Sequence, residues 1–436
     1  MTPDNSGMTA RTLPEWLAFI ERQHPKTIAM GLERVRAVAD AMALPGLMLS
    51  RPARHVAIVG GTNGKGSAVA FIEAIARAAG LRVGAYTSPH LLRYNERVRI
   101  DGADADDAAL VAAFEAVETA RADVPLTYFE YGTLAALWLF ARSDLDLAVL
   151  EVGLGGRLDA VNIVDPDVAA ITTVDLDHQD WLGADIETIG AEKAGIARAW
   201  KPLVLGDDDP PSTVLGHAYA IGASAVRIGC DFFFERDEDD SEHWRWREIG
   251  CELELPMPRL AAPVQLRNAA VAIAALRALP IDLPEAAYAA GVRDAQVAAR
   301  LQRFERDGVE CLVDVGHNPQ AARALAAWLA AAPAQGRTFA VFAALGDKDA
   351  VGVVEALAGQ VDRWWLAGLA DAGPRGLDAE AFAERLAGTA AADGTRCATV
   401  AGALAAARGE AAPGDRVLVF GSFHTAAAAL AAFASG

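Results

Sequence analysis

At residues 55–80 the chain reads HVAIVGGTNGKGSAVAFIEAIARAAG, and this stretch determines the fold that we predict. The apolar run Val56–Val59 predicts a buried strand, and Ala68–Ala79 predicts a helix that ends at Gly80. Between them lies the glycine-rich segment GGTNGKGS, at residues 60–67. The order of strand, glycine-rich loop and helix is typical of a loop that binds phosphate.

The residue types of this loop suit a polyphosphate. Glycines allow the backbone to wrap around phosphates, and the N-terminus of the next helix faces them. Lys65 would reach the terminal phosphates and Ser67 could help to hold magnesium, although Gly66 separates the two, unlike in the usual P-loop. An ordinary glycine-rich turn is the alternative, but the flanking strand and helix favour a phosphate loop. It comprises Gly61, Thr62, Asn63, Gly64, Lys65, Gly66 and Ser67.

Further strands and helices alternate on both sides of this stretch. Residues 12–50 predict short helices, and strands are predicted at Val83–Tyr86, Leu147–Val152 and Val168–Val174, with a helical run at 133–141. This alternation predicts a parallel sheet covered by helices. The acidic, aromatic stretch 231–256 predicts an insertion resembling a β-hairpin, and residues 268–279 predict a helix.

A second series of elements begins near residue 300. The predicted strands are 309–315, 338–345, 363–369, 396–400 and 416–420, and helices are predicted at 321–331 and 379–387. We therefore expect two domains, 1–298 and 299–436, the second a five- or six-stranded α/β unit. No G-x-G-x-x-G follows its first strand, which argues against a dinucleotide site.

Composition narrows the possible partners and compartment. The 436 residues suit two domains, and a net charge of −19 disfavours nucleic acid and anionic membranes as partners. The four cysteines form no C-x-x-C pair, which favours reduced thiols. No apolar signal core occurs in residues 1–16, and no apolar run has membrane-spanning length. We expect a soluble, cytoplasmic protein.

Polar residues end four of the predicted strands. Ser88 follows the strand at 83–86 and could be a magnesium ligand or a turn residue. Glu151 ends an apolar run, where a carboxylate is costly unless it is paired or bound to metal, or is simply solvated beyond the strand end. His178 lies in Asp175-Leu176-Asp177-His178, where His and Asp together could bind a cation, or the His could be structural. Because ligands bind at the carboxyl ends of parallel strands, this convergence predicts a cation and phosphate site.

Other candidates have simpler local explanations. Lys193 by itself reads as a surface lysine of a helix, and Asn268 as a helix N-cap. Asp314, His317 and Asn318 follow the first strand of the second domain. They could be turn residues, or they could cover the base and ribose of a nucleotide.

Nine segments in order resemble the folate branch of the Mur ligase superfamily, the dihydrofolate synthase/folylpolyglutamate synthases. The resemblance implies a P-loop parallel-sheet ATPase domain followed by a smaller Rossmann-like α/β domain. It spans nearly the whole chain, and TSPHL and GLGGRLDA are the segments most specific to this branch. The segments are GTNGKGS, TSPHLLRYNERVRI, TYFEYGTLAAL, EVGLGGRLDAVN, DLDHQDWLG, EKAGI, ARLQRF, VDVGHNP and GDKDA.

The resemblance implies residue roles. ATP would be bound by the phosphate loop with Asn268, Arg300 and Asp314. Ser88 and Glu151 would hold one magnesium ion and His178 a second, and Lys193 matches a lysine that the family carbamylates into a magnesium ligand. The pteroate would be held by Thr127, Tyr128, Phe129, Glu130, Leu158, Asp159 and Ala160. Gly31 and Leu32 lie where a pterin contact is expected, but residues 28–31 depart from the acidic pattern common there.

The implied enzyme joins L-glutamate to dihydropteroate and to folates. ATP would convert the carboxylate into an acyl phosphate, which the amine of glutamate attacks, with Lys65, Lys193 and His178 carrying the catalysis. We expect two Mg²⁺ ions, a monomer and bifunctionality. The alternatives are a monofunctional folylpolyglutamate synthase, a P-loop kinase or NTPase, and a nucleotide-binding module without catalysis.

Overall fold

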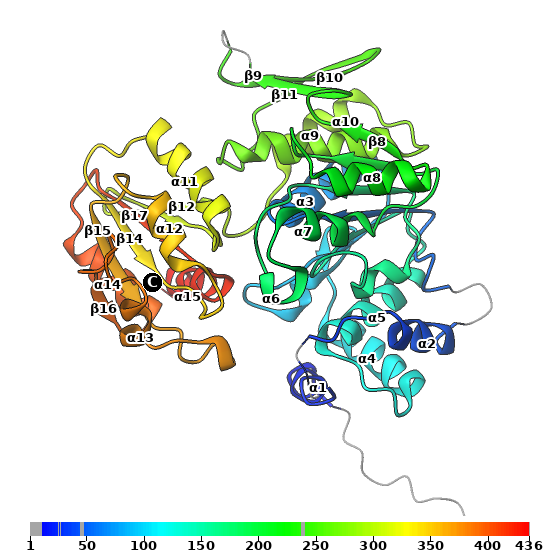
Figure 1. Ribbon diagram of the computed structural model, residues 1–436, viewed down its shortest axis with the longest axis horizontal. Helices are drawn as coiled ribbons and strands as arrows, with labels where there is room; N and C mark the ends of the chain where they lie inside the picture. Colours follow the sequence, from blue (N-terminus) through cyan, green and yellow to red (C-terminus); the bar gives the residue numbers. More distant parts are fainter. Residues whose placement is uncertain (1–10, 25, 27, 44–47, 237–239, 436) are drawn as a thin grey trace, which may run out of the picture.

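The computed structural model describes residues 11–24, 26, 28–43, 48–236 and 240–435. Residues 1–10, which carry most of the segment searched for a signal, lie outside this range. Figure 1 shows two α/β units, with the N-terminal elements in one and those after about residue 300 in the other. Within the described residues no helix is both long and apolar enough to cross a membrane.

The first unit is built on an eight-stranded sheet, with the order β4-β3-β2-β5-β1-β6-β7-β8. The strands from β2 to β8 in this order are parallel, and β3 and β4 are antiparallel additions at one edge. Their bounds are β1 His55–Gly60, β2 Val83–Tyr86, β3 Val98–Ile100, β4 Ala103–Asp104, β5 Leu147–Glu151, β6 Val168–Ile171, β7 Pro202–Leu205 and β8 Ser224–Arg227. The strand ends predicted to converge therefore belong to the four neighbouring strands β2, β5, β1 and β6.

β6 ends three residues before the predicted Val174. Residues 172 and 173 leave the sheet because they bond to the phosphate loop instead. Thr62 N–H donates to the Thr173 carbonyl at 2.7 Å, and Asn63 N–H donates to Thr173 Oγ1 at 3.1 Å. The apolar pattern alone cannot reveal these bonds, since the loop lies 110 residues away in the chain.

Helices cover both faces of this sheet (Figure 1). One face packs against α3 (Lys65–Ala78), α9 (Val264–Arg277) and α10 (Glu285–Asp294). The other face packs against α4 (Asp107–Arg121), α5 (Tyr128–Ala141), α7 (Ile186–Ala194) and α8 (Ser212–Ile221). The N-terminal helices α1 (Leu13–Ile20) and α2 (Glu33–Ala41) join this second core, and the short α6 (Gln179–Leu182) precedes α7.

The insertion predicted as a hairpin is a three-stranded antiparallel sheet. It comprises β9 (Phe232–Arg236), β10 (His243–Glu248) and β11 (Cys251–Pro256). The central strand β10 presents Trp244 and Trp246 to the core, both fully buried. Trp246 Nε1 donates to the Ala270 carbonyl at 3.2 Å, so the insertion packs against α9.

The second unit contains a six-stranded sheet with the order β12-β13-β17-β14-β15-β16, in which only β12 is antiparallel to its neighbour. The strands are β12 Gln302–Arg306, β13 Val309–Val313, β14 Thr338–Phe342, β15 Arg363–Ala367, β16 Thr395–Cys397 and β17 Arg416–Phe420. The helices are α11 Pro319–Ala331, α12 Ala350–Ala356, α13 Ala379–Glu384, α14 Val400–Glu410 and α15 Phe423–Ser435. The predicted fold class is confirmed, whereas the boundary at residues 298/299, between α10 and β12, stays a prediction.

Candidate active site

The phosphate loop runs from the end of β1 to the start of α3. Gly61 and Gly64 have φ angles of +139° and +88°, which side chains rarely adopt. A Cβ at Gly61 would lie 2.0 Å from Thr172 Oγ1, and one at Gly64 would lie 2.4 Å from Asn268 Oδ1. Asn268 of α9 therefore packs on the loop itself and is not an N-cap. The free N–H groups of the first turn of α3 begin where this loop ends.

Lys65 is folded over its own loop. Its Nζ donates to the carbonyls of Gly61 at 3.0 Å and Thr62 at 3.1 Å. Burial lowers the pKa of Lys65, and the negative charges of Glu151 and Asp177 oppose that shift. The terminal phosphates of a nucleotide are stronger acceptors than two carbonyls, so they would attract this ammonium group away from the loop.

Ser67 and Glu151 place oxygen atoms with few or no hydrogen-bond partners at the same edge of the sheet. Ser67 Oγ is buried without a hydrogen-bond partner among the described residues. Glu151 is 5% exposed and accepts one hydrogen bond, from the Ser88 N–H at 3.1 Å. Its carboxylate lies against the loop, since a Cβ at Gly66 would be 3.7 Å from Glu151 Oε2. Burial raises the pKa of Glu151, although Lys65 opposes the shift.

These oxygen atoms fit a hard divalent cation. Buried polar atoms normally have hydrogen-bond partners. The Ser67 hydroxyl, which has none among the described residues and lies near the buried Glu151 carboxylate, is therefore suited to bind a cation. No cluster of three or more His, Cys, Asp or Glu side chains with metal-site spacing occurs in the described chain. A site made of serine hydroxyls and one carboxylate would not form such a cluster, because it contains only one side chain of these four types.

Lys193 lies inside the protein and not on its surface. It is 3% exposed on α7, and no hydrogen bond or ion pair of its Nζ occurs within the described residues. Burial lowers the pKa of Lys193 to about 7, and the positive charge of Lys65 contributes to the shift. A substantial fraction of this amine is therefore uncharged, and nucleophilic, at neutral pH.

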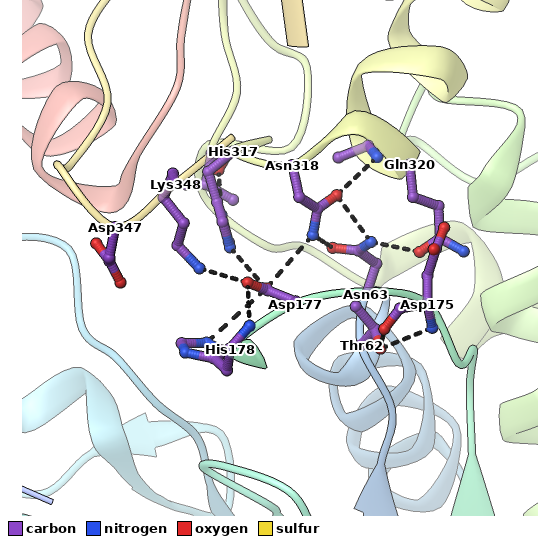
Figure 2. A network of polar contacts seen from close by, with 12 residues as sticks. Thr62, Asn63, Asp175, Asp177, His178, His317, Asn318, Gln320, Asp347 and Lys348 are labelled. Carbon is purple, nitrogen blue, oxygen red and sulfur yellow. Dashed lines mark hydrogen bonds and ion pairs between the residues drawn. The ribbon is translucent and has the colours of Figure 1, made fainter. Parts of the chain in front are cut away.

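Asp177 joins the two units (Figure 2). Its Oδ1 accepts from Lys348 Nζ at 2.7 Å, and its Oδ2 lies 3.4 Å from His317 Nε2. Burial alone would raise the pKa of Asp177, but the bond to His317 and the charge of Lys348 hold it well below its usual value. His178 has a φ of +51°, and burial lowers its pKa to about 4, so its ring is neutral and able to bind a cation.

A second set of contacts fixes the tip of the phosphate loop to α11 (Figure 2). Asn63 and Asn318 exchange two hydrogen bonds of 3.1 Å, Nδ2 to Oδ1 in each direction. Asn63 also donates to Gln320 Oε1, and Arg323 pairs with Asp175 at 3.0 Å. Asn318 also caps α11, because its Oδ1 accepts from the Ala321 N–H at 2.9 Å. It therefore both ends the turn before α11 and connects α11 to the phosphate loop.

A cavity of about 260 Å³ lies where the two units meet. It adjoins the Asp177–Lys348 pair, so its wall combines one cation with several acidic and polar groups. Its lining residues are Leu176, Asp177, His178, Gln179, Asp180, Trp181, Asn318, Pro319, Asp347, Lys348 and Asp349.

The residues expected to contact ATP lie on both sides of the loop. Arg300 is partly buried next to Gly66, with Nη2 3.9 Å from a Cβ built there. Burial lowers the pKa of Arg300, opposed by Asp314 and Glu151. Asp314 accepts from the N–H groups of Leu301 at 2.9 Å and Gly316 at 2.7 Å, so its oxygens also stabilise the turn after β13. His317, expected near the nucleotide, faces Asp177.

Two of the expected substrate residues build the start of α5. Thr127 and Glu130 form a capping box, in which Thr127 N–H donates to Glu130 Oε2 at 2.7 Å. Glu130 also pairs with Arg34 of α2 at 2.7 Å. Both side chains are therefore engaged within the protein, and their role in binding the pteroate stays a prediction.

The remaining substrate candidates surround the loop after β5. The Phe129 ring lies against Gly153, where a Cβ would be 2.6 Å from it. Asp159 accepts from the Leu154 and Val161 N–H groups, and burial raises its pKa to about 7. Leu158 is partly exposed, and Ala160 is buried at the start of a 3₁₀ turn. Gly31, with φ +132°, and Leu32 precede α2.

Sequence reasoning missed several residues of this site. Gln320 and Lys348 make contacts across the two units, and no role was predicted for them. Lys348 falls in GDKDA, a segment that carried the family resemblance, and this was the one available signal. Contacts between segments this far apart in the chain leave no local pattern.

Comparisons with known proteins agree with the fold. The Mur ligase middle domain matches residues 59–276, and the Mur ligase, glutamate ligase domain matches residues 299–423. An Escherichia coli dihydrofolate synthase/folylpolyglutamate synthase is 45% identical over 419 residues, which cover 96% of this chain and 94% of the relative. The chain therefore belongs to the Mur ligases and, within them, to the dihydrofolate synthase/folylpolyglutamate synthase family.

Solved structures give the same result. E. coli FolC in complex with DHPP and ADP has a TM-score of 0.91 and 43% identity, with 99% of both chains covered. A bifunctional folylpolyglutamate synthase/dihydrofolate synthase with Mn, AMPPNP and L-glutamate bound has a TM-score of 0.89 and 42% identity, covering 98% of this chain and 99% of the other.

Proposed function

We propose that this chain is an ATP-dependent ligase that adds L-glutamate to dihydropteroate, forming dihydrofolate, and to folates, extending their glutamyl tail. One observation carries the proposal: a phosphate loop, an unpartnered Ser67 hydroxyl and the buried Glu151 carboxylate meet at adjacent strand ends, in a chain 45% identical to a bifunctional relative over nearly its full length.

The chain's own residues account for positioning and charge stabilisation. The N–H groups of the loop and of α3 hold the phosphates, and Lys65 neutralises charge on the γ-phosphoryl group as it passes to the substrate carboxylate. Arg300 adds a second positive charge at the same place. The acyl phosphate has a good leaving group, and the α-amine of glutamate displaces phosphate to form the amide. The contacts of Asp177 and Asn63 hold the second unit against the loop, which keeps water from the intermediate.

A divalent cation fits the same place. Ser67, Ser88 and Glu151 would hold one ion, and His178 with a modified Lys193 would hold a second. Such an ion, when bound, supplies Lewis-acid stabilisation of the phosphoryl oxygens.

Carbamylation of Lys193 is part of the proposal. The neutral amine would add CO₂ and release a proton, giving an anionic carbamate in place of a cation. Deep burial, a pKa of about 7 and the absence of a partner for Nζ within the described residues support this reaction. An unmodified ammonium group there would be costly, whereas a carbamate bridging to a cation would be compensated.

The cavity between the units is proposed to take the amine substrate. Glutamate carries two carboxylates, and Lys348 is the buried cation that lines the cavity. The cavity adjoins Asp177 and His178, so an amine held there faces the proposed reaction centre. The monomeric state and the cytoplasmic location remain predictions from the sequence.

A substrate-dependent phosphate-release assay tests this function. Purified protein with ATP and Mg²⁺ should release phosphate with dihydropteroate plus L-glutamate and, separately, with a reduced folate plus L-glutamate. Release with the folate alone would leave a monofunctional folylpolyglutamate synthase. Release without glutamate would instead favour a P-loop kinase or NTPase.

A further inference from the structure

Arg97 is a buried cation without a carboxylate partner among the described residues. It is 8% exposed, at the end of the 3₁₀ turn Tyr94–Arg97. The two other buried arginines of the described chain are both paired, Arg121 with Glu118 at 2.6 Å and Arg416 with Glu310 at 2.5 Å. Arg97 makes no ion pair in the described chain, and its Nε donates to a neutral acceptor, His90 Nδ1, at 2.9 Å.

Aromatic rings surround the guanidinium group in place of an anion. Its Cζ lies 5.3 Å from the centre of the Tyr94 ring and 5.4 Å from that of Tyr128. Cation–π contacts offset part of the cost of burying a charge, but a counter-ion would offset more. A guanidinium group with its Nη atoms uncommitted is preorganised to pair with a planar carboxylate.

The position of Arg97 indicates which anionic ligand it could bind. Its carbonyl accepts from the Thr87 N–H at 2.9 Å, so it lies beside Ser88 and the metal-binding edge of the site. Tyr128, which it contacts, is the first residue of α5 and belongs to the expected pteroate-binding segment. The phosphate loop has its own cations in Lys65 and Arg300. The partner of Arg97 therefore belongs to the folate substrate and not to ATP.

We infer that Arg97 binds the α-carboxylate of the terminal glutamate of a folate substrate and thereby determines specificity for the tail-extending reaction. The inference rests on the proposed function. A guanidinium paired with the reacting γ-carboxylate would occupy the oxygen that must attack the phosphoryl group, whereas the neighbouring α-carboxylate takes no part in the chemistry. Dihydropteroate has only the reacting carboxylate, so it has no second carboxylate that could pair with Arg97.

The test compares the two substrates in Arg97→Gln. The ratio of kcat/KM for a reduced monoglutamyl folate to kcat/KM for dihydropteroate should fall by about 30-fold or more, as expected when one partner of a buried charge pair is removed. Arg93→Gln is the matched control, because Arg93 lies in the same segment but is exposed and pairs with Asp107. Its ratio should stay within about twofold of wild type. An unchanged ratio in Arg97→Gln would overturn the inference.

A change on the substrate side does not depend on how the variant folds. Wild-type protein should use the α-amide of the same folate about 30-fold less well than the folate, since the amide carries no charge for Arg97. Arg97→Gln, if folded, should show little of this penalty. Equal use of folate and α-amide by the wild type would overturn the inference. If the wild type ligates glutamate neither to the folate nor to dihydropteroate, the proposed function itself is overturned, and the inference with it.

Discussion

Lys348 Nζ of the second unit lies 2.7 Å from Asp177 Oδ1 of the first, and both groups are about nine-tenths buried. The pair forms one wall of the cavity between the units. The contact places a cation next to the strand ends that carry Glu151 and the phosphate loop. The contact positions the second unit, and we propose that Lys348 also provides a charge for an anionic substrate.

Replacing Lys348 tests this double role. Lys348→Ala should raise KM for L-glutamate by about 30-fold or more, because a buried cation that pairs with a carboxylate is lost. KM for ATP should change much less. Arg323→Ala is the control, since it removes the exposed ion pair with Asp175 across the same boundary. If both variants raise KM for glutamate equally, Lys348 acts only through the position of the unit.

Lys65 should be essential for turnover. Lys65→Ala should lower kcat by at least about 100-fold, as loss of a group that stabilises charge in the transition state usually does. Lys201→Ala, which removes a half-exposed lysine paired with Asp167, should retain near-normal kcat. Steady-state kinetics measures both, and circular dichroism checks folding. Normal turnover in folded Lys65→Ala would exclude the assigned role.

The Glu151 carboxylate should lower the free energy of unfolding at neutral pH, although it is proposed to bind a cation for the reaction. Its pKa is raised in the folded state by burial, so folding takes up a proton above pH 4.5, and the stability that the group contributes falls as pH rises. Glu151→Gln removes this charge. In buffer with EDTA, the variant's midpoint of thermal unfolding should exceed that of wild type by about 2–4 °C at pH 8 and by less at pH 5. A variant less stable than wild type at pH 8 would refute this account of Glu151.

The sequence predicted elements wherever local pattern and chemistry agree. Val56–Val59 and GGTNGKGS predicted β1 and the phosphate loop, but α3 begins at Lys65, three residues before the predicted Ala68, because the last residues of the loop form its first turn. The same reasoning extended β6 to Val174, because Thr172 and Thr173 suit a strand although they bond to the loop. It also missed the third strand of the insertion. The apolar run that precedes it singled out Glu151, and a segment match singled out Lys193, but the burial of Lys193 follows only from the packing of α7. Asn63 and Asn318 are 255 positions apart, so their paired bonds follow from folding alone.

Lys193 should be replaceable in part by an added carboxylate. Lys193→Ala should be inactive, because the proposed carbamate is lost along with its negative charge. Acetate or another short carboxylate should restore some turnover by occupying the vacated space. Lys65→Ala assayed in the same buffers is the control and should show no rescue. Failure of every short carboxylate to restore activity in a folded variant would count against a carbamate.

The most direct test follows the oxygen atoms of the activated carboxylate. Dihydropteroate labelled with ¹⁸O in its carboxylate, incubated with ATP, Mg²⁺ and L-glutamate, should transfer one labelled oxygen to the released phosphate for each amide formed. This result is required because an acyl phosphate keeps a carboxylate oxygen on phosphorus when the amine displaces it. Mass spectrometry of the phosphate gives the count. Unlabelled phosphate, or label in AMP, would contradict the central claim that this protein forms its amide through an acyl phosphate.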